Sequence, residues 1–303
     1  MNLKTLKSDA LLLITAAIWG LAFVAQRVGM DYIGPFLYNG VRFALGSLAL
    51  LPFALQPKSL AATRQNLKAV LIGGLVAGVT LFIGSSFQQV GLVYTTAGHA
   101  GFITGLYVVL VPLIGVLLKH KIFLHNWIGT ALAILGLFLL TVRPPFTVNK
   151  GDLYVLVSPM FYALHVHIIG WLTTRVNAGP LAFIQYATCS VLSMIIALGF
   201  EPINFSAIWQ AAIPILYGGL MSVGVAYSLQ IVGQRFAPPS HAAILLSMES
   251  VFAVLGGLWI IHETLSIKGI IGCTLMFLGM IVSQIGRGLL EKKLLTMDRI
   301  RDH

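Results

Sequence analysis

The residues of this sequence with the clearest chemical potential are two charged side chains set inside long apolar stretches. Glu249 lies in LLSMESVFAVLGGLW, residues 245–259, and Arg42 follows Tyr38 by about one helical turn. A buried charge is costly unless it is paired, neutralised or used. Glu249 therefore either lines a polar cavity or is a protonated carboxyl bonded to a neighbouring helix. Arg42 either binds a ligand carboxylate or locks helices together.

Aromatic, amide and imidazole side chains at helical spacing add to these two charges. Trp19 and Phe23 share one helix face, and Tyr162 shares a similar face with His165. Such stripes serve packing as readily as ligand binding, and histidines near helix starts often act as caps. The candidate binding residues are Trp19, Phe23, Arg42, Gln88, His99, Tyr107, Tyr162, His165, Gln230, His241 and Glu249. Aromatic faces attract cations and carboxylates pair with them, so this set suits a small ligand with an apolar body and an amine or amide group.

Residue spacing argues against several kinds of catalysis. An HExxH zinc motif built on His262 would need a second histidine where the chain has Ser266. His165 and His167 lie about 200° apart around a helix, so one metal ion cannot easily bind both. The sequence has no phosphate-binding P-loop, and Cys189 and Cys273 both lie inside apolar stretches. We therefore expect no cofactor, no metal ion and no direct use of ATP.

The elements that must position these side chains are apolar blocks of membrane-spanning length. Of 303 residues, 58% are hydrophobic and 9% are charged, whereas an ordinary globular domain has about 25% charged residues. A bilayer-spanning helix needs about 20 apolar residues. Ten such blocks lie near residues 9–30, 34–55, 69–91, 95–118, 125–142, 152–172, 180–200, 209–232, 239–261 and 267–286. The chain is predicted to be an all-α membrane protein with ten transmembrane helices, the first being retained and not cleaved as a signal peptide.

The basic residues predict how this bundle is oriented. The loops and tails on the side of the termini carry Lys4, Lys7, Lys58, Arg64, Lys68, Lys119, Lys121, Arg175, Arg235, Arg287, Lys292, Lys293, Arg299 and Arg301. The opposite side carries Arg143, Lys150 and Lys268. Because Lys and Arg accumulate in cytoplasmic loops, both termini are expected in the cytoplasm. This orientation explains the net charge of +10 without a nucleic-acid partner.

The two halves of the chain repeat each other at an offset of 142 or 143 residues. The matched positions are Gln88 with Gln230, His99 with His241, Asp9 with Asp152, Gly129 with Gly272 and Gly136 with Gly279. We predict a five-helix repeat at 1–142, a linker at 143–150 and a second repeat at 151–286. Residues 287–303 form a basic cytoplasmic tail, either an amphipathic helix on anionic lipid or a solvated chain. Because five is odd, the repeats must be inverted, as in many transporters.

Three segments carry a family resemblance. AIWGLAFVAQRV, QQVGLVYTTAGHAGFITGLYVVLVPLIGVLL and LLSMESVFAVLGGLWIIHETLSIKGIIGCTLMFLGMIVS resemble the EamA branch of the drug/metabolite transporter superfamily. The resemblance implies a central cavity between two inverted halves that moves small metabolites, often outward. Two positions depart from the family pattern. Lys121 stands where the repeat mate is Glu263, and Ser250 replaces a frequent proline, which should make this helix less kinked.

The sequence therefore predicts a secondary transporter, most simply an exporter of small amphipathic metabolites such as amino acids or related nitrogenous compounds. It would work by alternating access in a bacterial inner membrane, with protons as a candidate coupling ion through Glu249. The alternative is an intramembrane enzyme acting on a lipid or prenyl substrate, although such enzymes usually present clusters of acids. A receptor without transport is disfavoured by the inverted duplication.

Overall fold

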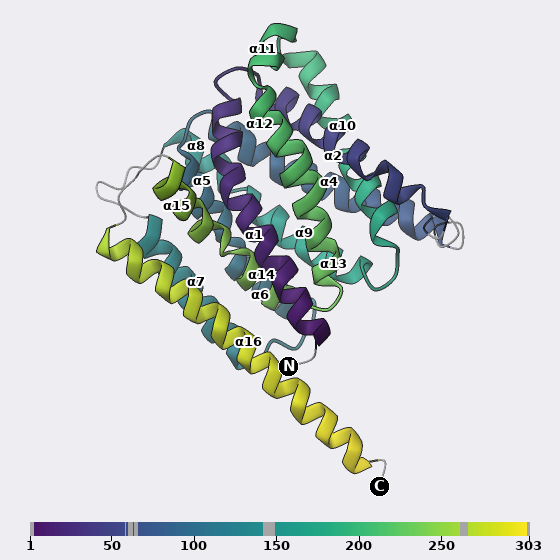
Figure 1. Ribbon diagram of the computed structural model, residues 1–303, viewed down its shortest axis with the longest axis vertical. Coiled ribbons are helices and arrows are strands. Elements are labelled where there is room, and N and C mark those ends of the chain that lie inside the picture. Colours follow the sequence, from purple (N-terminus) through teal and green to yellow (C-terminus); the bar gives the residue numbers. More distant parts are fainter. Residues whose placement is uncertain are drawn as a thin grey trace.

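The structure is a computed structural model that describes residues 3–57, 59, 63, 66–141, 149–260 and 266–301. All regular secondary structure within these residues is helical. The elements, in chain order (Figure 1), are α1 (Leu3–Gly29), α2 (Pro35–Ala54), α4 (Leu67–Leu92), α5 (Ala97–Gly105), α6 (Tyr107–Leu117), α7 (Leu124–Thr141), α8 (Lys150–Val155), α9 (Ser158–Leu172), α10 (Ala178–Phe200), α11 (Phe205–Gln210), α12 (Ala212–Leu216), the π-helix η1 (Tyr217–Tyr227), α13 (Ser228–Gln234), α14 (Pro239–Leu246), α15 (Glu249–Ile260) and α16 (Ile267–Arg301).

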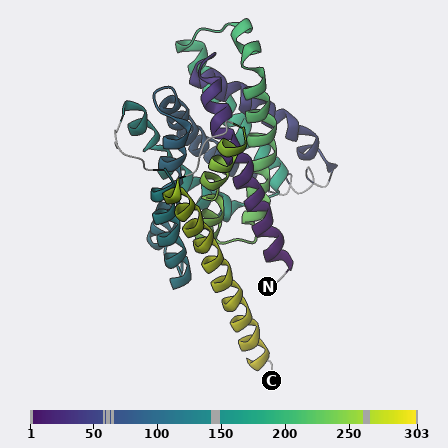
Figure 2. The ribbon, with the colours of Figure 1, turned by 60° about the vertical axis from the view of Figure 1, so that its left-hand side comes forward.

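These helices form a multi-pass membrane protein. Within the described residues, eight helical stretches are long and apolar enough to cross a bilayer, and Leu124–Leu140 and Pro239–Leu255 are two shorter apolar helices. The two chain ends lie at the same end of the bundle (Figures 1 and 2), as an even number of crossings requires. Large apolar side chains such as Leu117 and Ile213 are exposed on its outside, where lipid would cover them. The predicted fold class, ten transmembrane helices in two inverted repeats, is confirmed.

The contact between α7 and α16 displays the repeat directly. A Cβ atom added to Gly136 would lie 2.5 Å from the backbone oxygen of Gly272, and one added to Gly272 would lie 2.6 Å from that of Gly136. Gly129 and Gly279 face each other in the same reciprocal way. Only glycine allows two helix backbones this close. The four repeat-related glycines therefore meet at one antiparallel contact between the repeats, where each glycine faces the mate of the other glycine on its helix.

The two repeats also share one apolar core. Its largest cluster includes Leu12 of α1, Val108 and Val111 of α6, and Ile244 and Leu245 of α14. Each of these side chains is 0% or 1% exposed. Because residues from both repeats fill the same core, this packing fixes the positions of the surrounding helices relative to one another.

Two of the spans that meet this core are broken at repeat-related positions. The fourth span divides into α5 and α6 at Leu106, whose N–H bonds the Ile103 carbonyl at 3.2 Å. The ninth divides into α14 and α15 at residues 247–248, where Met248 N–H bonds the Leu245 carbonyl at 3.2 Å. Such bonds to the third preceding residue tighten a helix locally. The ninth span is therefore interrupted next to Ser250 without a proline at that position, although Ser250 was expected to make this helix less kinked.

The C-terminal tail is continuous with the last span. The backbone of α16 is one continuous helix from Ile267 to Arg301, and it extends beyond the rest of the bundle (Figure 1). The tail from residue 287 to Arg301 therefore continues the helix of the last span, and its placement on anionic lipid or in solvent stays a prediction. Residues 142–148, which include most of the predicted linker, and Glu263 lie outside the described residues.

Candidate functional site

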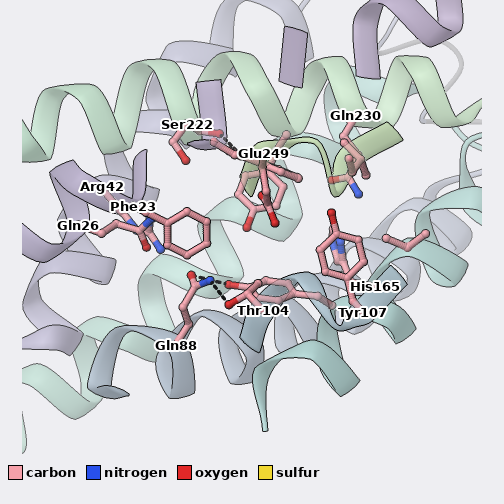
Figure 3. A pocket seen from close by; sticks show the side chains of 15 residues that line it. Phe23, Gln26, Arg42, Gln88, Thr104, Tyr107, His165, Ser222, Gln230 and Glu249 are labelled. Carbon is pink, nitrogen blue, oxygen red and sulfur yellow. Dashed lines mark hydrogen bonds between the residues drawn. The ribbon is translucent and has the colours of Figure 1, made fainter. Parts of the chain in front are cut away.

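A small central cavity gathers polar side chains from both repeats (Figure 3). It is lined by Trp19, Phe23, Gln26, Arg42, Gln88, Thr104, Tyr107, Tyr162, His165, Val166, Ser222, Tyr227, Gln230, Leu246 and Glu249. All the candidate binding residues except His99 and His241 are among them. The cavity has a volume of about 40 Å³, enough for about three water molecules. In this conformation the cavity is therefore small.

The lining is built largely from repeat mates. Residues 142 or 143 positions apart pair Trp19 with Tyr162, Phe23 with Val166, Gln88 with Gln230, Thr104 with Leu246 and Tyr107 with Glu249. The inverted repeats therefore present equivalent positions to the cavity, with the same side chain at Gln88 and Gln230 and different side chains in the other four pairs. Two of the pairs, Thr104 with Leu246 and Tyr107 with Glu249, combine an apolar or aromatic residue with a more polar one, so the two sides of the cavity differ chemically at these positions.

Glu249 is held at the cavity by its place at the start of α15. The residue is 3% exposed, and its carboxyl oxygen Oε1 is buried without a hydrogen-bond partner among the described residues. Behind it, α1 approaches closely at Gly20, where a Cβ atom would lie 2.5 Å from the Glu249 backbone oxygen. A carboxylate in the first helical turn is favoured by the helix dipole. The side chain thus faces the cavity on a rigidly packed backbone.

Arg42 reaches the same cavity from α2. It is 2% exposed, and its Nε donates a hydrogen bond to Asn39 Oδ1 at 2.9 Å. Its guanidinium carbon lies 5.5 Å from the centroid of the Tyr38 ring and 5.0 Å from that of Phe43. These contacts fix the guanidinium by an amide and two aromatic faces. Within the part of the chain that the structure describes, no acid pairs with it.

A hydrogen-bonded group joins the two repeats across the cavity. Gln88 donates from Nε2 to Thr104 Oγ1 at 3.0 Å, and Tyr162 donates from its hydroxyl to Gln88 Oε1 at 3.0 Å. On the other wall, Trp19 donates from Nε1 to the Ser222 carbonyl at 3.2 Å and packs edge-on against Tyr227 at 4.5 Å between ring centroids. These contacts hold the aromatic walls in place.

Other polar atoms of the lining have no partner. Gln26 Oε1, Tyr107 Oη and Gln230 Oε1 are buried and unbonded among the described residues, like Glu249 Oε1. Buried polar groups are almost always hydrogen-bonded, so each such group needs an explanation. Because all of these residues line one cavity, a polar ligand or water there would satisfy them.

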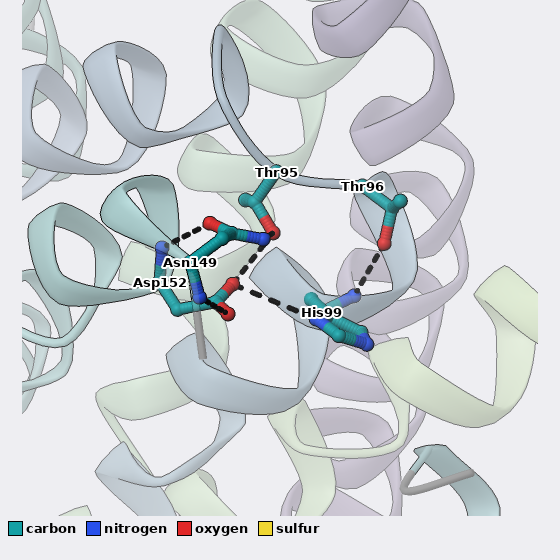
Figure 4. Close-up of polar contacts among 5 residues, drawn as sticks. All are labelled: Thr95, Thr96, His99, Asn149 and Asp152. Atoms are coloured by element: carbon teal, nitrogen blue, oxygen red, sulfur yellow. Dashed lines mark hydrogen bonds and ion pairs between the residues drawn. The ribbon is translucent and has the colours of Figure 1, made fainter. Parts of the chain in front are cut away.

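His99 and His241 lie away from this cavity, in two repeat-related contacts with acids. His241 Nε2 lies 3.0 Å from Asp9 Oδ1, and His99 Nδ1 lies 3.6 Å from Asp152 Oδ1 (Figure 4). Each histidine comes eight residues before a lining residue on its own span, Tyr107 or Glu249, which is about 12 Å along a helix. That separation explains why neither side chain reaches the cavity.

Several lining residues were not among the candidates. Val166 is the repeat mate of Phe23, so the repeat would have found it. Thr104 and Leu246 lie one helical turn before the candidates Tyr107 and Glu249, so helical spacing would have found them. Ser222 and Tyr227 lie in η1. A π-helix has a different period from an α-helix, so no α-helical face predicts them.

A second hollow lies between α4, α6 and α9. Its volume is about 830 Å³, and it is lined mostly by apolar side chains, with Lys68, His120 and His167 among the polar exceptions. The described residues of its lining include no carboxylate. The central cavity, where both repeats contribute opposite charges and unpartnered polar atoms, is therefore the better candidate site.

Comparisons with known proteins agree with this architecture. The EamA-like transporter family model matches residues 6–142 and again residues 149–284. An uncharacterized transporter of Archaeoglobus fulgidus is 32% identical over 93% of this chain and 87% of its own length. The threonine/homoserine exporter RhtA of Escherichia coli is 28% identical over 84% of this chain and 83% of its own. A crystal structure with 18% identity superposes with a TM-score of 0.78, covering 94% of this chain and 98% of that one, and shares the fold.

Proposed function

The chain belongs to the EamA-like transporter family, and from that premise we propose that it exports small zwitterionic metabolites of the amino-acid type. The observation that carries the proposal is the pair of opposite charges in the central cavity. Arg42 and Glu249 both line it, and neither forms an ion pair within the described residues. An α-amino acid supplies the missing partner for each, a carboxylate for Arg42 and an ammonium for Glu249.

The rest of the lining fits the body of such a molecule. Trp19 and Tyr227 offer aromatic faces, while Gln26 and Gln230 offer unpartnered amide oxygens that accept hydrogen bonds from an ammonium or hydroxyl group. Among the described residues, Arg42 is the only permanent positive charge in the lining. Sugar phosphates, which carry more negative charge than one arginine balances, fit poorly. The name of the relative RhtA, a threonine/homoserine exporter, supports the amino-acid class.

Transport proceeds by alternating access. At about 40 Å³ the cavity is far below the roughly 300 Å³ of a typical small-molecule site. The helices must therefore part to admit substrate and close again around it. Inverted repeats allow this switch, because exchanging the conformations of the two halves moves the opening of the cavity to the other side of the membrane. Glu249 is the candidate carrier of a coupling proton, since its carboxyl is ionisable and faces the substrate.

The setting is a bacterial inner membrane with both termini in the cytoplasm, as the distribution of Lys and Arg favours. No covalent chemistry is part of the proposal, and the relatives described above carry the names of transporters. The two repeats at 1–142 and 151–286 are the two halves that move relative to each other during transport.

Resistance of cells to a toxic amino-acid analogue tests this function. Cells that overproduce the protein should tolerate levels of a toxic threonine or homoserine analogue that stop the growth of cells with an empty vector. Retention of the radiolabelled compound should fall in parallel. Equal growth and equal retention in both strains, for every amino-acid analogue tried, would reject the proposal.

A further inference from the structure

We propose that two repeat-related aspartate–histidine pairs control access to the central cavity by closing its two ends in alternation. Asp9 with His241 closes the end that holds the chain termini, and Asp152 with His99 closes the far end. The proposal rests on the transport function of the family and not on the choice of substrate.

The placement of the pairs along the helices carries the argument. Asp9 and Asp152 come ten residues before Trp19 and Tyr162, and the two histidines come eight residues before Tyr107 and Glu249. At 1.5 Å per residue, each pair lies about 12–15 Å from the cavity along its helices. Each of these four spans therefore lines the cavity near its middle and carries an Asp or a His near its N-terminal end.

Each pair also joins the two repeats. Asp9 and His99 belong to the first repeat, whereas His241 and Asp152 belong to the second. Asp9 is near the N-terminus, and α8, which carries Asp152, lies toward the opposite end of the bundle (Figure 1). A contact that spans both repeats at one end of the cavity must break when the repeats separate at that end.

The two pairs are in different states in this structure. The side chains of His241 and Asp9 are 2% and 1% exposed, and their atoms are 3.0 Å apart. His241 Nδ1 is also 2.8 Å from Ser283 Oγ, and Gln284 donates to Asp9 Oδ2 at 3.1 Å. This end is therefore sealed by a group of buried hydrogen bonds that includes two residues of α16.

The far pair is looser. His99 and Asp152 are 3.6 Å apart, and the imidazole is 35% exposed. Asp152 already accepts hydrogen bonds from Thr95 Oγ1 at 2.6 Å and from the Asn149 backbone N–H at 3.0 Å (Figure 4). The carboxylate therefore stays satisfied when His99 moves away. Exchange of the two repeat conformations shortens the far pair and separates Asp9 from His241, which opens the termini end.

The test uses a reporter thiol in the cavity and reads from which side it is reached. Ser222→Cys, a nearly isosteric change, is combined with Cys189→Ala and Cys273→Ala. A membrane-impermeant maleimide is added to right-side-out and to inside-out vesicles, and initial labelling rates are compared. This readout needs no substrate, so it is independent of the amino-acid proposal.

Breaking each pair should change access in opposite directions. Asp9→Ala should raise labelling from the termini side relative to the far side by about tenfold, as expected from the loss of a charged hydrogen bond. Asp152→Ala should shift the ratio toward the far side. The proposal would be overturned if Asp9→Ala and Asp152→Ala both left the labelling ratio unchanged, or if both shifted it toward the same side.

A milder variant guards against misfolding of the aspartate variants. Ser283→Ala removes only the hydroxyl group at His241 Nδ1 and leaves both members of the pair in place. It should shift the labelling ratio in the same direction as Asp9→Ala, by a smaller factor. A structural role alone would lower thermal stability without changing the ratio, and that result would contradict the proposal.

Discussion

Arg42 and Glu249, both within the described part of the chain, line one cavity without forming an ion pair with each other. Opposite charges in a poorly solvated site attract strongly, so something must hold them apart. Arg42 is held by Asn39 and two aromatic rings, and Glu249 by its place at the start of α15. The separation leaves a guanidinium and a carboxyl group that a zwitterion can satisfy together.

Replacing Glu249 with glutamine should impair transport without preventing membrane insertion. Glu249→Gln keeps the size of the side chain but removes its charge and its ability to exchange a proton. We expect amino-acid flux to fall by roughly 30-fold or more, since losing one partner of a buried charge pair costs about 2–5 kcal/mol. The pH dependence of the remaining flux should change as well.

The neighbouring Ser250→Ala serves as the control, because Ser250 is buried but does not line the cavity. Flux is measured in proteoliposomes over a range of pH. If Glu249→Gln transports like the unmodified protein at every pH, Glu249 has only a structural role.

Replacing Arg42 should discriminate between ligands with and without a carboxylate. Arg42→Gln should raise the KM for an amino acid by about tenfold or more, since charged hydrogen bonds contribute about 1.5–3 kcal/mol. Arg42→Lys should give an intermediate KM, because lysine keeps the charge but not the planar donor geometry. Competition by the corresponding amine, which lacks the carboxylate, should be unaffected. If the Arg42 variants bind the amino acid and the amine equally weakly, Arg42 has only a packing role.

Trp19→Ala should abolish the tolerance of overproducing cells to a toxic substrate while expression stays normal. The substitution removes the aromatic face that packs on Tyr227 and the hydrogen bond to the Ser222 carbonyl. Trp19→Phe keeps the face and should keep part of the tolerance. Trp209→Ala is a matched control, since Trp209 is 81% exposed and should be dispensable. If cells that overproduce the Trp19→Ala variant keep full tolerance, Trp19 does not contribute to the binding site.

The contact between α1 and α15 should be sensitive to a single methyl group. In Gly20→Ala the new Cβ would lie 2.5 Å from the Glu249 oxygen and 2.7 Å from the Ala253 nitrogen, both of them backbone atoms. The helices must move apart, at a cost of about 1–3 kcal/mol. Gly199→Ala meets nothing within 4 Å and should be neutral or slightly stabilising. The melting temperatures of the two variants are compared by thermal unfolding in detergent. Equal melting temperatures would show that α1 can move away from α15 without loss of stability.

The fold was largely predictable because bilayer physics leaves a strong signal in sequence. Blocks of about 20 apolar residues give the spans, and recurring residues such as Gly129 with Gly272 give the repeat. The helix breaks were not predictable, since the turn at Leu106 needs neither proline nor glycine at that position. Breaks of this kind depend on tertiary packing, and local propensity does not encode them.

The candidate site was predictable where polar residues stand out against apolar spans. Glu249, Arg42 and the glutamines Gln88 and Gln230 all line the cavity, because polar groups within a membrane face a bundle interior. The same rule misplaced His241. A buried polar residue also fits a contact between helices, and only the fold shows that His241 pairs with Asp9.

Counterflow in proteoliposomes most directly tests whether the cavity recognises a zwitterion. Vesicles loaded with unlabelled threonine should accumulate external radiolabelled threonine. An excess of external threonine should compete, whereas the amine without its carboxylate and the hydroxy acid without its ammonium should compete at least about tenfold more weakly, since each leaves Arg42 or Glu249 unpaired. Equal competition by either single-charge analogue, or robust counterflow of a sugar phosphate with amino acids ignored, would contradict recognition by this pair.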